Sequence, residues 1–139
     1  MALDINNLIA NYEEKMEKDK SKSFKNKTIK QNEVWLVELG EDNIVGHEQK
    51  GNRPFYVISS SHYNDISQTP VGFFTSMSEK KKTSKYVIEI DVGGGNKQYV
   101  NISQIRTLCT SRFKKLMYTG KPEDLKNILD LYDREIIKG

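Results

Sequence analysis

Three side chains in the sequence carry groups that together can act on a phosphate: the carboxylate of Glu48, the guanidinium of Arg53 and the hydroxyl of Thr75. Glu48 and Arg53 lie in the glycine-punctuated stretch GHEQKGNRPFYVIS. Proline biases the residue before it toward extended backbone, so Pro54 partly sets the direction of Arg53. A guanidinium presents a planar set of donors that suits a phosphate. The stretch therefore predicts an anion site at the start of a strand.

These groups suffice for cleavage of RNA by its own 2′-hydroxyl, which attacks the neighbouring phosphorus, expels the 5′-oxygen and leaves a cyclic phosphate. The reaction needs a proton acceptor, charge stabilisation on the non-bridging oxygens, and orientation. Glu48 can accept the proton, and Thr75 can hydrogen-bond the phosphate. Because the pKa of a guanidinium lies above about 12, Arg53 is assigned electrostatic stabilisation and not proton donation. The reaction requires no metal ion and no other cofactor.

Each of these residues also has a structural interpretation. An arginine next to a strand is often one half of a surface ion pair, and Glu48 is an obvious mate for Arg53. A threonine at a strand end is a good strand former. The residue types and their spacing leave the catalytic and the structural interpretations open.

The elements that must position these residues are short strands. β-forming runs predict strands at 33–39, 54–60, 70–76, 85–91 and 97–103, and residues 104–108 either continue the last strand or begin another after a bulge. Residues 61–69 are expected to form a loop, 77–84 a charged turn, and 93–96 (GGGN) a tight turn. Short strands at hairpin spacing predict a mainly β fold, a small antiparallel barrel. If the second and third strands are neighbours, Glu48, Arg53 and Thr75 converge at one rim.

A helix is predicted at the C-terminal end of the chain and an arm at its N-terminal end. Pro122 suits the first position of a C-terminal helix, whose apolar stripe is expected at Leu125, Ile128, Leu129, Tyr132 and Ile136. A short helical turn is expected at 111–115. Residues 1–31 are expected to form an arm, with a helix near 3–16 and a Lys- and Ser-rich tether, and residues 32–139 to form the barrel domain. The arm is interpreted as a surface helix on a flexible tether, with docking to a partner or nucleic acid as the alternative.

Composition sets limits on the class of protein. The net charge is +3, and the first 32 residues contribute seven lysines against five acidic residues, so a nucleic-acid surface would be a local patch. The single cysteine, Cys109, excludes an intramolecular disulfide and agrees with a reducing compartment. There is no stretch suited to a signal peptide or to a membrane span, which predicts a cytoplasmic protein without a membrane partner. No metal site is expected.

Three segments resemble the MazF/PemK family of toxin endoribonucleases from toxin–antitoxin systems. EVWLVELG resembles the family's first strand, GHEQKGNRPFYVIS its Gly-Ser-Glu-Gln-x-Gly-x-Arg-Pro loop, and QIRTL its Gln-Ile-Arg-Thr-Ile segment. The resemblance covers roughly residues 33–137. It implies an SH3-like antiparallel barrel of the CcdB/PemK type with a C-terminal helix, working as a homodimer.

The resemblance also implies roles for individual residues. Arg53 and Thr75 fall on the family's catalytic arginine and threonine, and Glu48 falls on its loop glutamate. RNA contacts are expected from the residues of the groove and of the lysine loop after the third strand: Gln49, Asn52, Ser76, Lys80, Lys81, Lys82, Gln104 and Arg106. The lysine loop has a second interpretation as a solvated hairpin tip. The implied activity is metal-independent, sequence-specific cleavage of single-stranded RNA, mainly mRNA, and the implied partner is a MazE-like antitoxin.

The sequence departs from the family pattern at four positions: His47 replaces a usual Ser, Met77 a Gln, Ser103 a Glu and Cys109 an Asp. These changes bear on sequence preference and turnover, since Arg53 and Thr75 remain. Two rival functions stay open. One is a CcdB-like toxin that binds gyrase and cuts nothing, and the other is an RNA-binding relative that has lost catalysis through the changes at Met77 and Ser103.

Overall fold

The computed structural model describes residues 27–40, 51–77 and 84–139. Its strands are β1 (Glu33–Glu38), β2 (Asn52–Val57), β3 (Val71–Ser76), β4 (Val87–Gly93), β5 (Asn96–Thr107) and β6 (Phe113–Thr119). Its helical elements are α2 (Ser61–Ser67), the 3₁₀ turn η4 (Thr110–Arg112), α3 (Pro122–Tyr132) and the π-helical turn η5 (Asp133–Ile137). Within these ranges, no helix has both the length and the apolar composition that crossing a bilayer requires.

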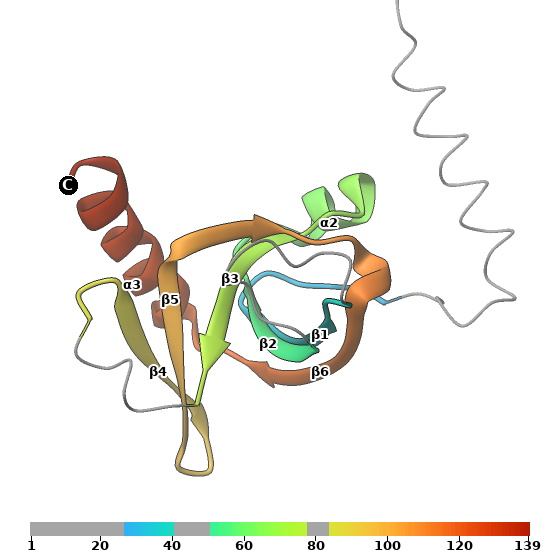
Figure 1. Cartoon of the computed structure of the whole chain (residues 1–139), viewed down its shortest axis with the longest axis horizontal. Helices are drawn as coiled ribbons and strands as arrows, with labels where there is room; N and C mark the ends of the chain where they lie inside the picture. The colour runs from blue at the N-terminus through green and yellow to red at the C-terminus, as the bar shows by residue number, and fades with distance from the viewer. Residues whose placement is uncertain (1–26, 41–50, 78–83) are drawn as a thin grey trace, which may run out of the picture.

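All six strands belong to one antiparallel sheet with the order β4-β5-β3-β2-β1-β6. The sheet curls into a barrel-like shape, with α3 beside β4 and β5 (Figure 1). The predicted mainly β barrel with a C-terminal helix is confirmed. The GGGN turn is confirmed as well, since Gly93, Gly94 and Gly95 all have positive φ angles.

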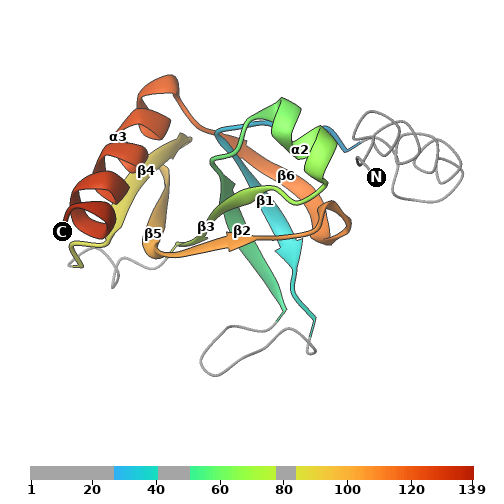
Figure 2. The ribbon, with the colours of Figure 1, turned by 90° about the horizontal axis from the view of Figure 1, so that it is seen from above.

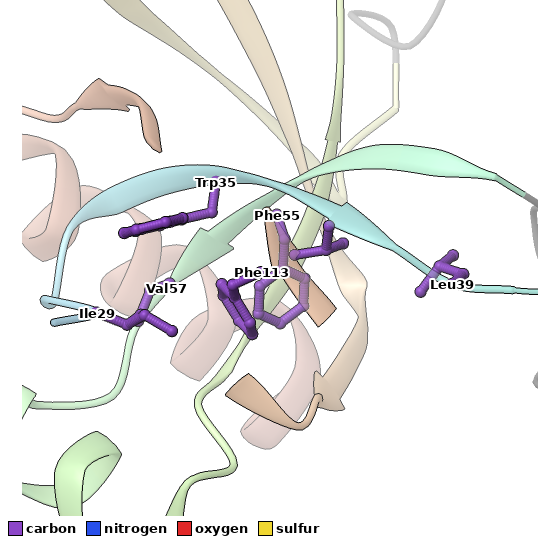
Figure 3. Close-up of a cluster of buried hydrophobic side chains, with 7 residues drawn as sticks. Ile29, Trp35, Leu39, Phe55, Val57 and Phe113 are labelled. Carbon is purple, nitrogen blue, oxygen red and sulfur yellow. The ribbon is translucent and has the colours of Figure 1, made fainter. Parts of the chain in front are cut away.

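Alternation along the strands divides the core into two clusters, one on each side of the sheet. The inner cluster, shown in Figure 3, contains aromatic rings in edge-to-face contact, with ring centroids 5.8 Å apart for Phe55 and Phe113 and 6.0 Å apart for Trp35 and Phe113. The outer cluster includes Phe73 and the one buried residue of α3, Ile128. Phe73 is fully buried, whereas Phe74 is partly buried and packs on the inner cluster. The sheet thus curls around the inner cluster, and α3, which lies beside β4 in Figure 2, packs on the outer cluster.

The prediction of a loop at 61–69 was wrong, because most of this segment is helix α2. The Ser60 side chain accepts a hydrogen bond from the Tyr63 backbone N–H at 3.1 Å and caps the helix. Asn64 is 1 % exposed, and its Nδ2 donates to the Ile29 carbonyl at 2.8 Å. The helix is therefore held by a cap and a buried amide, which hydrophobic periodicity does not reveal.

Strand β6 was missed by the sequence analysis. The helical turn expected at 111–115 is only the short turn η4, after which the chain becomes extended at Phe113. β6 pairs with β1 and is the edge strand of the sheet on that side. The pairing has two register shifts. The alternation of β6 is blurred because Lys114, Lys115 and Leu116 are all exposed.

Helix α3 begins as expected, with Pro122 in its first turn and the Lys121 backbone N–H donating to Asp124 Oδ2 at 2.8 Å. The apolar stripe is only partly buried. Ile128 is fully buried, but Leu129 and Ile136 are 39 % and 38 % exposed. Leu125 and Tyr132 pack on the outer cluster as predicted, and so does Leu131, which the predicted stripe did not include.

Residues just before β1 contribute to the barrel. Ile29 is 1 % exposed in the inner cluster, and the Gln31 Nε2 donates to the Ile58 carbonyl at 2.8 Å. The predicted helix near 3–16 lies outside the described residues. The division into an arm of 1–31 and a barrel of 32–139 stays a prediction.

Deletion of residues 1–27 is expected to leave a cooperative thermal unfolding transition, because Ile29 and the contacts of 28–31 are retained. Ile29→Ala in the full chain is expected to cost about 2–5 kcal/mol, since it removes a fully buried side chain from the inner cluster. Calorimetry on both proteins checks this. A deletion that costs more than Ile29→Ala would place part of 1–27 in the core.

Candidate active site and RNA-binding surface

Arg53 lies near the start of β2, where it pairs across the sheet with Val37 of β1. Its guanidinium carbon lies 5.8 Å from the centroid of the Phe74 ring on β3. The Nε atom is buried and has no hydrogen-bond partner in the part of the chain that the structure describes. Burial lowers the pKa of Arg53, but a guanidinium stays protonated at neutral pH. A partly desolvated cation with a spare donor is suited to an anion.

A pocket of about 180 Å³ adjoins this arginine through the shared Phe74. Two further arginines line it: Arg106 of β5 and Arg112 of η4, together with Leu39, Thr107, Leu108 and Cys109. Arg112 Nη1 donates to the Leu39 carbonyl at 2.6 Å and to the Glu38 carbonyl at 3.1 Å, which fixes the end of β1. The pocket is therefore concave and cationic, with one aromatic wall.

Cys109 lines the pocket together with Arg112, and the pKa of its thiol is lowered. Burial by itself raises its pKa, but hydrogen bonds with Ser111 and the charge of Arg112 lower it on balance. The Ser111 hydroxyl lies 3.3 Å from Cys109 Sγ. The charge of Arg112, which contributes to this lowering after the hydrogen bonds, also favours a phosphate in the pocket.

Thr75 is almost fully buried, with 1 % exposure, near the end of β3. Its hydroxyl donates to the side-chain oxygen of Gln98 on β5, with 2.6 Å between Oγ1 and Oε1. Gln98 is 0 % exposed, and its Nε2 has no hydrogen-bond partner within the described ranges. The sequence analysis missed Gln98, because a glutamine in the run KQYVN has the appearance of a surface strand residue.

Arg53 and Thr75 share one edge of the sheet. β2 and β3 are antiparallel neighbours with Phe55 opposite Phe74, so the start of β2 meets the end of β3. Continuing this register places Arg53 opposite Ser76. Successive residues of a strand point to opposite faces, so Arg53 lies on the Phe74 side and Thr75 on the side of Gln98. The structure brings the two residues to one rim without joining them by a hydrogen bond.

The other predicted site residues divide into two groups. Asn52 is exposed at the start of β2, Ser76 is half-buried at the end of β3, Gln104 is exposed on β5, and Arg106 lines the pocket. β5 shifts register against β3 between Phe73 and Thr75, so it carries the bulge that the sequence left open near Gln104. Glu48, Gln49, Lys80, Lys81 and Lys82 lie outside the described residues, so their predicted roles stay predictions.

Residues 30–131 match the family model described as the PemK-like, MazF-like toxin of type II toxin-antitoxin systems. The chain belongs to this family. The predicted resemblance is therefore confirmed over most of the sequence. The chain is also 32 % identical over 82 residues to the endoribonuclease PemK of Escherichia coli, a match that covers 58 % of this chain and 60 % of that protein.

Solved structures share the fold of this chain. MazF from Deinococcus radiodurans aligns with a TM-score of 0.67 at 17 % identity, covering 78 % of this chain and 96 % of that one. An endoribonuclease from a mycobacterial species, solved in complex with its cognate antitoxin, aligns with a TM-score of 0.64 at 15 % identity, covering 80 % and 97 %. At these identities the likeness shows the barrel fold of the PemK/MazF family.

Proposed function

We propose that this protein is the toxin of a type II toxin–antitoxin system and a sequence-specific endoribonuclease that cleaves single-stranded RNA, mainly mRNA. The family of the chain and its relative named endoribonuclease PemK support this activity. The observation that carries the proposal is the placement of Arg53. Its half-buried guanidinium has a spare Nε donor and lies beside a pocket lined by two more arginines.

In this reaction the RNA backbone lies along the rim formed by the start of β2 and the end of β3. Arg53 stabilises the charge that develops on the non-bridging phosphate oxygens as the 2′-hydroxyl attacks. Glu48 accepts the proton of the attacking hydroxyl, and Thr75 donates a hydrogen bond to the phosphate. The products are a 2′,3′-cyclic phosphate and a 5′-hydroxyl, and no metal ion takes part.

The remaining RNA contacts surround these residues. Arg106 and the pocket bind a neighbouring phosphate, and exposed amides flank the rim at Asn52 and Gln104. Gln49, Ser76, Lys80, Lys81 and Lys82 complete the RNA surface. Because lysine and arginine contacts to phosphates release counterions, affinity for RNA falls as the salt concentration rises.

The protein acts in the cytoplasm as a homodimer, and a MazE-like antitoxin inhibits it by covering the RNA surface. The support is that a solved endoribonuclease of this fold is described in complex with its cognate antitoxin. The cationic pocket is an attractive site for an acidic segment of such a partner.

Wild-type protein incubated with a long single-stranded RNA in excess EDTA is expected to cut at discrete sites. The fragments should carry 2′,3′-cyclic phosphate and 5′-hydroxyl ends, which are measured by end-specific labelling and primer extension. Double-stranded RNA of the same sequence is the control and should stay intact. Growth arrest on expression with cellular mRNA intact would contradict the proposal and favour a CcdB-like gyrase binder.

A further inference from the structure

The buried part of β5 holds a polar side chain that the proposed mechanism has not used. Gln98 is fully buried, and its partner across the sheet on β4 is the buried Ile90. Val100 and Ile102, two and four residues along the same strand, belong to the outer apolar cluster. An aliphatic side chain would fill this place without bringing an amide into the core.

The Gln98 amide is only half satisfied. Its Oε1 accepts the Thr75 hydroxyl at 2.6 Å, and its buried Nε2 has no hydrogen-bond partner among the described residues. An unpaired buried donor is destabilising, and such groups are rare in native cores. Because Thr75 is the hydrogen-bond partner of this amide, any role of Gln98 is exerted on Thr75.

The Thr75 hydroxyl has one proton, and in this arrangement it is given to Gln98. A phosphate oxygen is an acceptor, so Thr75 has nothing to donate to it. Rotation of the amide by half a turn exchanges Oε1 and Nε2. Nε2 then donates to Thr75 Oγ1, which frees the hydroxyl proton and polarises the O–H bond.

The rotated arrangement is accessible in the same space. It leaves an unpaired carbonyl oxygen in place of an unpaired N–H, and buried carbonyls without a full set of partners are the more common of the two. The separation of 2.6 Å suits an O–H···O bond and is short for N–H···O, so the rotation requires the two side chains to move apart slightly. The Thr75 and Gln98 side chains can therefore form a hydrogen bond with either orientation of the amide.

We propose that Gln98 is a positioning residue for Thr75: the Gln98 amide holds the Thr75 hydroxyl and, when rotated, frees its proton for a phosphate oxygen of the RNA. Because Thr75 is 1 % exposed, the phosphate reaches the hydroxyl only once the end of β3 opens toward the RNA. This inference rests on the proposed function. Gln98 itself touches neither the RNA nor the reacting atoms. Its contribution is made in the transition state, so it acts on kcat and leaves KM unchanged.

The test is steady-state cleavage of an RNA oligonucleotide that carries one site mapped with the wild-type protein. Gln98→Met keeps the volume and removes the amide, and it is expected to lower kcat about 10- to 100-fold at unchanged KM. Its melting temperature should stay close to that of wild type, because the change removes the unpaired N–H of Gln98 but leaves the buried Thr75 hydroxyl without its acceptor. Gln98→Asn, whose amide is too short to reach Thr75, should show the same loss of kcat if the Met variant does not fold.

A double-mutant cycle with Thr75→Val separates positioning from packing. If Gln98 acts through Thr75, adding Gln98→Met to Thr75→Val has no further effect on kcat. Ile90→Val is the matched control, since it loosens the packing beside Gln98 and should leave kcat at the wild-type value. Wild-type kcat in Gln98→Met, or independent losses in the double variant, overturns the inference alone. Failure of the wild-type protein to cut RNA overturns the proposed function and this inference with it.

Discussion

Arg53→Ala is expected to lower the rate of RNA cleavage about 100- to 1000-fold while the protein stays folded. The estimate is that for removing one group that stabilises charge in a transition state. Truncation removes the guanidinium beside Phe74 and leaves the pocket lined by Arg106 and Arg112 in place. RNA binding should therefore weaken much less than turnover. Single-turnover cleavage in EDTA, with binding measured by fluorescence anisotropy, checks both expectations.

Two further variants sharpen this result. Arg53→Lys keeps the charge and loses the planar set of donors, so it should recover only part of the lost rate. Arg134→Ala is the matched control, because it removes the same side chain and charge from the exposed turn η5, where Arg134 pairs with Glu135. Equal activity of Arg53→Ala and Arg134→Ala would make Arg53 a structural residue, the alternative that its sequence leaves open.

The strands that form the site could be predicted because local sequence determines them. β1, β2 and β3 are short runs of β-forming residues bounded by polar segments, and strands that follow one another along the chain pair here as antiparallel neighbours. Pro54 marks the extended backbone that carries Arg53. The rim where β2 starts and β3 ends follows once these two strands are neighbours, a condition that the sequence analysis assumed and the structure shows.

The errors occurred where tertiary contacts override local preference. α2 has seven residues, and its one buried side chain is the polar Asn64, so no apolar stripe marks it as a helix. β6 exposes Lys114, Lys115 and Leu116 in succession, which conceals the alternation of a strand. Both elements are fixed by partners distant in sequence, namely Ile29 for the Asn64 amide and β1 for β6.

Gln98 could not be recognised from the sequence for a related reason. It follows three residues without an apolar side chain at the start of the run GNKQYVNIS, so its burial depends on the pairing of β5 with β4 and not on the local sequence. The role of Thr75 as a hydrogen-bond donor likewise depends on what its hydroxyl faces. Residue types predict which chemical groups lie at the rim. Packing determines which of their protons are already donated to another side chain.

Gly72→Ala is expected to be the most damaging single-methyl change in the barrel. A Cβ at this position would lie 1.9 Å from the Tyr56 carbonyl oxygen and 2.8 Å from Phe55 Cε2, and the first of these atoms is backbone. The methyl group therefore forces β3 away from β2 and cannot be accommodated by a side-chain rotation. We expect a loss of about 3 kcal/mol or more in the free energy of unfolding, at the upper end for overpacking.

This change also affects the site, because β3 carries Thr75 three residues beyond Gly72 and its pairing with β2 sets the rim beside Arg53. Any Gly72→Ala protein that folds at low temperature should cleave RNA more slowly than wild type. Gly95→Ala is the matched control: its φ is +78°, but nothing lies within 4 Å of the added methyl. It should lower the free energy of unfolding by about 1 kcal/mol, the strain of a left-handed backbone at alanine, and leave RNA cleavage at the wild-type rate. Equal denaturation midpoints for the two variants would mean that β2 and β3 can move apart without loss of stability. The geometry of the rim would then be set by a contact other than their pairing.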